Sequence, residues 1–327
     1  MNRRLALTQL AALCAAGAAP AAFAQADKPI NIVVPYTPGG TTDMLGRLLA
    51  QQLAPKLGRT VIVENKPGAG SGVGAAQVAR SPADGNTLLV ATSTTLAINP
   101  WLYKQLAYDP AKDFAPIGMI GAVPLLLVVN PSLPAKTVAE LVALSKSRPG
   151  GLVYGSAGNG SPHHLAAEMF KAATGAKLTH VPYRGSSPAV TDLLGGQIDL
   201  VFSDIPPALG HVKLNKLRAI AVSSAKRQPA VAEVPTIAES GASGTKGFEA
   251  VAWQCVVAPA GTPAELVKRY SEALAEVMKD PALRKRLEGD GFEPVEKPMS
   301  PEQLAAYQRA ETARWGQVVK ASGTTLD

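Results

Sequence analysis

Short apolar runs alternate with amphipathic segments along most of this 327-residue chain. The run from Ile30 to Pro35 is rich in β-branched residues, and after it leucines recur at helical spacing until Gly58. The same pattern predicts strands at 60–64 and 87–91, with a helix between them that ends near Arg80. Strands that alternate with helices predict a parallel sheet with right-handed crossovers.

A second series of the same kind follows the long apolar stretch 117–129. It predicts helices near 138–147, 162–173, 188–194 and 207–212, and strands at 152–154, 178–181, 198–202 and 217–222. The chain is then rich in Pro, Ser, Gly and Ala from Lys226 to Gly247. A strand at 250–258 leads into amphipathic helices at 263–279, 281–288 and 301–319. No third sheet fits this tail, so we expect it to complete the first unit.

This organisation predicts an α/β protein of two lobes, each a mixed sheet flanked by helices, with a ligand cleft between them. The first domain comprises 27–124 and 250–327, and the second comprises 125–249 with the return linker. The chain then crosses between the lobes twice, near 123–128 and between Ser223 and Ala250. Two crossings form a hinge.

The first residues have the composition of a secretory signal peptide. Arg3 and Arg4 precede an apolar run that is too short for a membrane span, and A-x-A sites end at Ala24 and Ala26. We expect residues 1–26 to be the signal, cleaved after Ala24 or Ala26, and export by either the Sec or the twin-arginine route. Cys255 then stands alone, so an internal disulfide is excluded.

The net charge of +7 and the 5% aromatic content argue against a nucleic-acid partner. The basic residues are spread singly along predicted helices, whereas nucleic-acid binding favours clusters on one face with stacking aromatics. We interpret them as solvated helix faces.

Two loops join a strand to a helix start through small, turn-forming residues, the first at 38–42 and the second at 155–161. Glycine lets backbone N–H groups approach a ligand, and a helix N-terminus adds about half a positive charge. A single such loop is typical of a tight turn, but a pair, one in each lobe, predicts a facing cleft for an anion. The expected contacts are Pro38, Gly39, Gly40, Thr41, Thr42, Ser156, Gly158, Asn159 and Ser161. Thr41 or Thr42 is also a candidate helix cap.

Hydroxyl groups and one carboxyl group stand at other predicted strand ends. The segment Thr92-Ser93-Thr94-Thr95 follows the strand at 87–91 and adds four hydroxyls. We expect Ser93 and Thr94 to contact the ligand, and the alternative role of the segment is a helix cap. Asp204 follows the strand at 198–202 and either contacts the ligand or caps the turn into Pro206. An ionised Asp204 that reached the ligand would repel a second carboxylate and favour an amino or hydroxy acid.

Three other patterns were considered as signs of a dinucleotide site, a metal site and a serine nucleophile, and each argues against that site. Residues 68–75 contain G-x-G-x-x-A, but Lys66 intervenes after the strand and the next strand ends without an acid, so we expect a helix held close to the sheet instead of a dinucleotide site. His163 and His164 are adjacent and diverge by about 100° on a helix, so they cannot share a metal. No G-x-S-x-G elbow is present.

In order along the chain, the loops resemble one known family. The motifs are Val34-Pro35-Tyr36, Pro38-Gly39-Gly40 with Asp43, Glu64-Asn65-Lys66-Pro67-Gly68-Ala69-Gly70, Asp84-Gly85, Asn99-Pro100, Asp113-Phe114, Tyr154 with 156–161, Val181-Pro182-Tyr183 with Gly185, and Ala258-Pro259-Ala260-Gly261-Thr262-Pro263. They are similar to those of the periplasmic substrate-binding proteins of tripartite tricarboxylate transporters, the Bug family. The resemblance spans nearly the whole mature chain.

The resemblance implies a two-lobed periplasmic-binding-protein fold of type II, no cofactor, and a small carboxylate held mainly by backbone groups and ordered water. It implies a monomer in the periplasm with integral-membrane transporter subunits as partners, and it adds Tyr36, Tyr183 and Gly185 to the expected contacts. The chain departs from the family at Ser203-Asp204 and at Gln254-Cys255, where pocket walls are expected. Ligand identity is therefore not transferred.

Two functions from different classes follow. One is a solute-binding protein that serves a transporter or a sensing partner. The other is a secreted α/β enzyme, hydrolase-like, acting on a small acid. They differ in turnover, because a binding protein returns its ligand unchanged whereas an enzyme needs an activated nucleophile or a metal.

Overall fold

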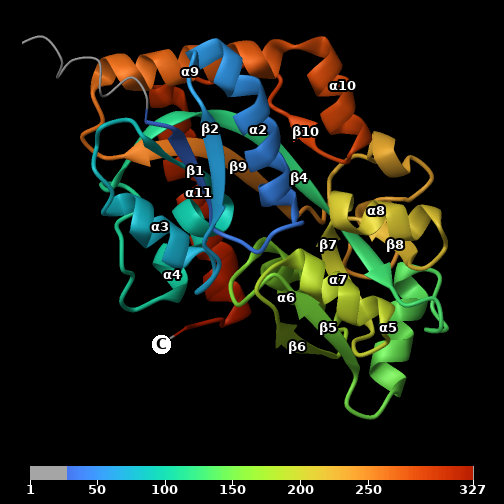
Figure 1. The fold of residues 1–327 in the computed structure, drawn as a ribbon. Coiled ribbons are helices and arrows are strands. Elements are labelled where there is room, and N and C mark those ends of the chain that lie inside the picture. Colours follow the sequence, from blue (N-terminus) through green and yellow to red (C-terminus); the bar gives the residue numbers. More distant parts are fainter. Residues whose placement is uncertain (1–27, 327) are drawn as a thin grey trace, which may run out of the picture.

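The computed structural model describes residues 28–326, so the predicted signal peptide lies outside the described part. The chain forms two lobes joined by strand β4 (Phe114–Val129), drawn in green across both lobes in Figure 1. The predicted α/β fold of two lobes is confirmed.

The sheet of the first lobe has the order β2-β1-β3-β9-β4. Its first three strands are parallel, and β9 runs antiparallel to both β3 and β4. The strands are β1 (Ile30–Val34), β2 (Val61–Asn65), β3 (Thr87–Thr92) and β9 (Val251–Pro259). A two-residue strand, β10 (Glu293–Pro294), pairs with the middle of β4.

The second lobe repeats this order with β6, β5, β7, β4 and β8. Three strands are again parallel, and the far half of β4 runs antiparallel to β7 and β8. The strands are β5 (Leu152–Ser156), β6 (Leu178–Pro182), β7 (Leu200–Asp204) and β8 (Arg218–Val222). In each lobe the fourth strand is thus one that has crossed from the other lobe.

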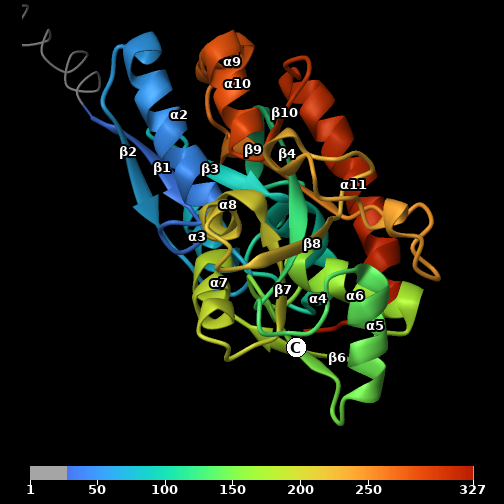
Figure 2. The same cartoon turned by 90° about the vertical axis from the view of Figure 1, so that its right-hand side faces the viewer.

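Helices cover both faces of the sheets. The first lobe has α2 (Thr41–Leu57), α3 (Gly72–Ala79), a π-helical turn (Thr94–Ile98), α4 (Asn99–Leu102), α9 (Ala264–Lys279), α10 (Pro281–Gly289) and α11 (Pro301–Ser322). The second has α5 (Val138–Ser147), α6 (Pro162–Thr174), α7 (Ser186–Leu194) and α8 (Ile205–Lys213). Figure 2 shows α9 and α10 over the first lobe, with α11 beside them and extending toward α6.

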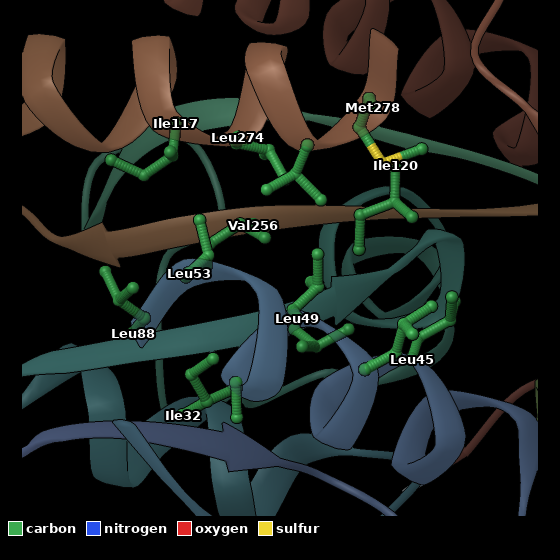
Figure 3. Close-up of a cluster of buried hydrophobic side chains, with 14 of the residues drawn as sticks. Ile32, Leu45, Leu49, Leu53, Leu88, Ile117, Ile120, Val256, Leu274 and Met278 are labelled. Atoms are coloured by element: carbon green, nitrogen blue, oxygen red, sulfur yellow. The ribbon is translucent and has the colours of Figure 1, made fainter. Parts of the chain in front are cut away.

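The core of the first lobe lies on both faces of its sheet. Leu45 and Leu49 of α2 meet Leu274 of α9 over strand side chains such as Ile32 and Val256 (Figure 3). Each such fully buried side chain contributes about 1.5–3 kcal/mol through the hydrophobic effect. The apolar clusters of the second lobe are drawn from residues between 125 and 250. The domain boundaries near 124 and 250 stay a prediction, which this division supports.

One serine ties the two crossings together. Ser223 Oγ accepts a hydrogen bond from the Leu125 N–H and donates one to the Ala250 carbonyl, and the Ser223 backbone bonds to the same two residues. Both crossings meet at this point, and the hinge predicted there stays a prediction.

Candidate ligand-binding cleft

A pocket lies between the lobes, and the space free of protein atoms within it is about 430 Å³, open solvent included. It forms where β1, β3, β5 and β7 end, because the carboxyl ends of parallel strands share one edge of a sheet. Its lining residues are Tyr36, Thr37, Gly40, Thr41, Thr42, Thr92, Thr94, Ala157, Pro162, His163, Gly185, Ser186, Asp204, Ala252, Trp253 and Gln254.

The lobes are closed on this pocket. The Thr37 hydroxyl of the first lobe donates to the Arg184 carbonyl of the second across 3.5 Å. A Cβ atom placed on Gly160 would lie 1.7 Å from Leu102 Cδ1 of the opposite lobe. Leu165 of α6 is buried in an apolar cluster of the first lobe. The two lobes therefore contact each other beside the pocket, and an opening motion would break these contacts.

The first loop presents an uncapped helix start. The N-cap of α2 is Gly40, which offers no side-chain bond, so the expectation that Thr41 or Thr42 caps this helix is wrong. Both threonines lie inside the helix and line the pocket, and the buried Thr41 hydroxyl has no partner in the described chain. The N-cap side chain therefore satisfies none of the N–H groups that the first turn of a helix leaves without an intrahelical partner.

Asp43 holds this loop in shape. Its Oδ2 accepts from the Gly39 N–H at 2.9 Å and from Arg47 Nε at 3.0 Å, and its Oδ1 accepts from Asn65. Burial raises the pKa of Asp43, but the bonds from Arg47 and Gly39 outweigh it and leave the pKa below its usual value. Since its N–H is used in this way, Gly39 supports the loop. Neither Gly39 nor Pro38 lines the pocket.

In the second loop the hydroxyl groups are used internally. Ser156 Oγ bonds to the backbone of Gly158 and lies 2.6 Å from His180 Nε2. Ser161 caps α6 through the His164 N–H and donates to the Gly158 carbonyl. Ala157, which the prediction did not include, lines the pocket. Gly158 and Asn159 line an adjoining cavity together with Tyr183, whose hydroxyl donates to Asp192.

Three aromatic rings are stacked behind this loop. The His164 and His180 centroids lie 4.0 Å apart, and Tyr154 stacks on His180 at 4.8 Å. Burial lowers the pKa of His180 to about 3 and also lowers the pKa of His164. Both imidazoles are therefore neutral supports of the loop at ordinary pH.

A third helix start joins the cleft from the second lobe. The N-cap of α7 is Gly185, which has no side chain to cap the helix, and Ser186 lines the pocket. A Cβ atom on Gly185 would lie 2.6 Å from Thr37 Oγ1, so only glycine allows the lobes to approach this closely. The buried Ser187 hydroxyl has no partner in residues 28–326. Helices α2 and α7 therefore direct uncapped N-termini into one pocket from opposite lobes.

Of the four hydroxyl residues 92–95 at the end of β3, some bond to other side chains and some line the pocket. Thr95 bonds to Ser71 and Thr92, and Thr92 lies 3.3 Å from the Tyr36 hydroxyl. Burial raises the pKa of Tyr36, so its phenol stays protonated. Thr94 lines the pocket, whereas Ser93 does not, and neither hydroxyl has a partner in the described chain. Ser93 makes no side-chain capping bond, but Thr92 Oγ1 accepts a hydrogen bond from the Thr95 N–H at 3.4 Å, so the cap role in this segment belongs to Thr92.

Asp204 lines the pocket and is paired. Although it is the N-cap residue of α8, its side chain makes no capping bond, so the alternative role in that turn is wrong. Its carboxylate contacts His163 Nε2 at 3.0 Å and accepts from Ser186 Oγ at 3.3 Å. Burial raises the pKa of Asp204, but His163 and Ser186 outweigh it and the pKa is lowered. The Thr41 hydroxyl also lies near and lowers this pKa, yet it completes no hydrogen bond.

The glycine run at 68–75 packs as expected. A Cβ atom on Gly74 would lie 2.9 Å from Pro35 Cβ, so the start of α3 is held against the end of β1. Gly70 lies beside the Asn159 carbonyl of the other lobe, where its Cβ would be 3.2 Å away. This loop therefore also meets the second lobe on closure.

Several pocket residues were not predicted as contacts. His163 was considered only as a metal ligand, and Gln254 only as a departure from a family pattern. Ser186 follows a glycine at a helix start, which is the signal used for the other two loops, so it could have been found. The others are Thr37, Thr92, Ala157, Pro162, Ala252 and Trp253.

Two lobes joined by two crossings, with a polar pocket enclosed between uncapped helix starts, define a solute-binding protein of the type-II periplasmic class. The family described as "Tripartite tricarboxylate transporter family receptor" matches residues 45–324. The chain is similar to Protein BugT of Bordetella pertussis (strain Tohama I), with 37% identity over 100% of this chain and 99% of that protein. It belongs to this family of periplasmic solute-binding receptors.

Two solved structures are similar throughout. "R. palustris Rpa4515 with adipate" shares 38% identity at a TM-score of 0.87, covering 91% of this chain and 98% of that one. "MatC (Rpa3494) from Rhodopseudomonas palustris with bound malate" shares 32% identity at a TM-score of 0.82, covering 89% and 98%. Within residues 28–326, none of the helices has the length and apolar character needed to cross a membrane.

Proposed function

We propose that this protein captures a small carboxylic acid in the cleft and delivers it unchanged to the membrane subunits of a tripartite transporter or to a sensing partner. The observation that carries the proposal is the meeting of the uncapped N-termini of α2 and α7 in one enclosed pocket. The predicted export through residues 1–26, action as a monomer, and the domain division at 124 and 250 belong to the same proposal.

The chemistry of the lining fits a carboxylate. Each helix start contributes a partial positive charge of about half a unit and free N–H groups, and Thr41 and Thr94 add unpartnered hydroxyls. The lining residues, all within the described chain, include no Lys or Arg. An anion would therefore be held by dipoles and hydrogen bonds. The two similar structures contain adipate and malate, which are both carboxylic acids.

The arrangement of polar groups favours binding over turnover. Ser186 bonds to Asp204 and not to His163, so the Asp204 carboxylate lies between the serine and the histidine. A serine nucleophile would need the histidine beside it as the general base. Cys255 is fully buried in the core, and burial raises the pKa of its thiol, which keeps it protonated and unreactive.

Calorimetry and thermal unfolding with a panel of mono- and dicarboxylic acids test this function. At ligand near one hundred times Kd, binding to the folded state alone adds about 2.7 kcal/mol, so we expect the melting temperature to rise by several degrees. The matched neutral amides of the same acids are the control and should give no rise. Mass spectrometry should recover the ligand unchanged. A panel without any stabilising acid, or the appearance of a product, would contradict the proposal.

A further inference from the structure

Besides the hydroxyls of Thr41 and Thr94, two buried side-chain atoms that line the cleft have no partner in the described chain, and one comes from each lobe. Gln254 is 4% exposed and His163 is 6% exposed, and both line the pocket. Within residues 28–326, Gln254 Oε1 and His163 Nδ1 make no hydrogen bond. Polar groups this deeply buried are rarely left unpaired, because losing water without a new partner is costly. An occupant of the pocket is the natural partner for both.

Gln254 faces the pocket because of its place on β9. Its strand neighbours Trp253 and Cys255 belong to the apolar cluster on one face of the sheet, and alternation directs Gln254 to the other. It is paired in register with Thr92, at the end of β3 where the pocket begins. An apolar side chain could fill this position without an unpaired amide, so the amide indicates a polar occupant.

His163 has its proton position set by Asp204. The Nε2 atom lies 3.0 Å from Asp204 Oδ1, and the other carboxylate oxygen is held by Ser186. The pKa of Asp204 is lowered, and an ionised carboxylate can only accept, so Nε2 carries a proton. In the neutral imidazole, which the inference requires, Nδ1 is then an acceptor. Gln254 Oε1 is also an acceptor, so the two unpartnered atoms call for hydrogen-bond donors.

We propose that Gln254 and His163 determine specificity by selecting a carboxylic acid that carries an ammonium group. One ammonium can donate to Gln254 Oε1 and to His163 Nδ1, whereas a hydroxyl has a single hydrogen to donate and a carboxylate has none. The carboxylate of Asp204 behind His163 further favours a cation at this end of the cleft. The inference rests on the proposed function, in which the helix starts hold the carboxylate of the same ligand.

Two series of acids that differ in one group provide the test. Aspartate, malate and succinate share one skeleton, and 4-aminobutyrate, 4-hydroxybutyrate and succinate place the group at the far end. In calorimetry at pH 8 we expect the amino member of at least one series to bind about tenfold more tightly than its counterparts. If a hydroxy acid or succinate binds as tightly in both series, the inference is wrong while the proposed function stands. If no acid binds at all, both fail.

Variants at Gln254 test the direction of its hydrogen bond. Gln254→Glu keeps an acceptor oxygen and should retain binding of the amino acid, whereas Gln254→Leu should weaken binding of the amino acid about tenfold relative to binding of succinate. Gln51→Glu on the exposed face of α2 is the matched control and should change nothing. Gln254→Leu should melt no lower than the wild type, because it removes an unpaired group. Loss of the amino acid in Gln254→Glu, or a lower melting point in Gln254→Leu, would overturn the inference.

Asp204 is a positioning residue, and nitrogen NMR of labelled histidine reads its effect directly. At pH 8 the wild type should carry the His163 proton on Nε2, and Asp204→Asn should shift that proton toward Nδ1 and reduce the amino preference about tenfold. A wild-type protein with Nδ1 protonated at this pH would overturn the inference, because Nδ1 could then no longer accept.

Discussion

Asp43 shows how one buried carboxylate can shape a binding loop without lining the pocket. It accepts from the Gly39 N–H, from Arg47 and from Asn65, and it stays ionised because these donors lower its pKa. Gly39 and Gly40 can therefore turn tightly before α2, and Gly40 leaves the start of this helix without a side-chain cap. The supporting acid and the binding groups are separate residues.

Asp43→Ala should loosen this loop. We expect the affinity for the ligand to fall about tenfold and the free energy of unfolding to fall by about 1–3 kcal/mol, because the Gly39 N–H and the Asn65 amide lose their acceptor. Calorimetry and urea unfolding measure the two effects. Arg47→Ala is the control: its side chain is 56% exposed, so the loss should stay below about 1 kcal/mol and binding should be kept. Unchanged binding in Asp43→Ala would show that the loop does not need its carboxylate.

The pairing of β5 with β6, covered by α6, places two neutral histidines behind the second loop. Because His180 touches Ser156 and His164 accepts from the Gly160 N–H, the stack connects the sheet with the loop backbone. A charge on either ring would be placed against the other ring at 4.0 Å. The loop is therefore supported best when both rings are uncharged.

Acid should consequently destabilise the protein before its carboxylates titrate. As pH falls from 6.5, the unfolded chain takes up protons on His180, whereas the folded chain resists until about pH 3. The unfolded state then binds more protons, so stability falls with pH across this window. The slope is at most about 1.4 kcal/mol per pH unit for one proton, and partial exposure of His180 reduces it.

His180→Gln should flatten this dependence. Urea unfolding between pH 6.5 and 5 should give a shallower slope in the variant, because a titrating group has been removed while an amide can still bond to Ser156. Above pH 7 the two proteins should have parallel profiles, which serves as the internal control. Equal slopes below pH 6.5 would mean that His180 is not the linked group.

Closure of the lobes depends on glycines at which a side chain would collide with the other lobe. Gly160 has φ +69° and faces Leu102, and Gly185 faces Thr37. The hydrogen bonds of Ser223 lie elsewhere, where β4 and the return segment are tied together. Binding and closure are coupled because the pocket is complete only when these faces meet.

Gly160→Ala should hold the lobes apart. We expect the affinity to fall at least tenfold and the ligand-induced decrease in the radius of gyration, measured by X-ray scattering, to be lost, since the new Cβ overlaps Leu102. Gly150→Ala is the matched control, because Gly150 also has positive φ but no atom within 4 Å of its Cβ. Adding Leu102→Ala should restore part of the closure in a double-mutant cycle. Normal compaction in Gly160→Ala would contradict this account.

The hydrophobic pattern determined the elements because each helix and strand must bury one face, and that requirement is written locally. This pattern predicted the two lobes, the return of the tail to the first lobe, and the two glycine loops between a strand and a helix start. The predicted loops at 38–42 and 155–161 do lie at the cleft, but Ser156, Ser161 and Gly39 hold the loops, whereas Thr41 and Thr42 line the pocket.

Only the tertiary structure decided which polar groups would be left free. Whether a hydroxyl or carboxylate is satisfied depends on neighbours far along the chain: Asp204 meets His163, and Ser71 meets Thr95. The residues next to Gln254 and His163 in the sequence give no sign of a ligand contact. These two side chains indicate one only because the folded lobes bury Gln254 Oε1 and His163 Nδ1 without a partner in the described chain. The sequence thus determined the fold and the position of the cleft, whereas long-range packing determined the chemistry inside it.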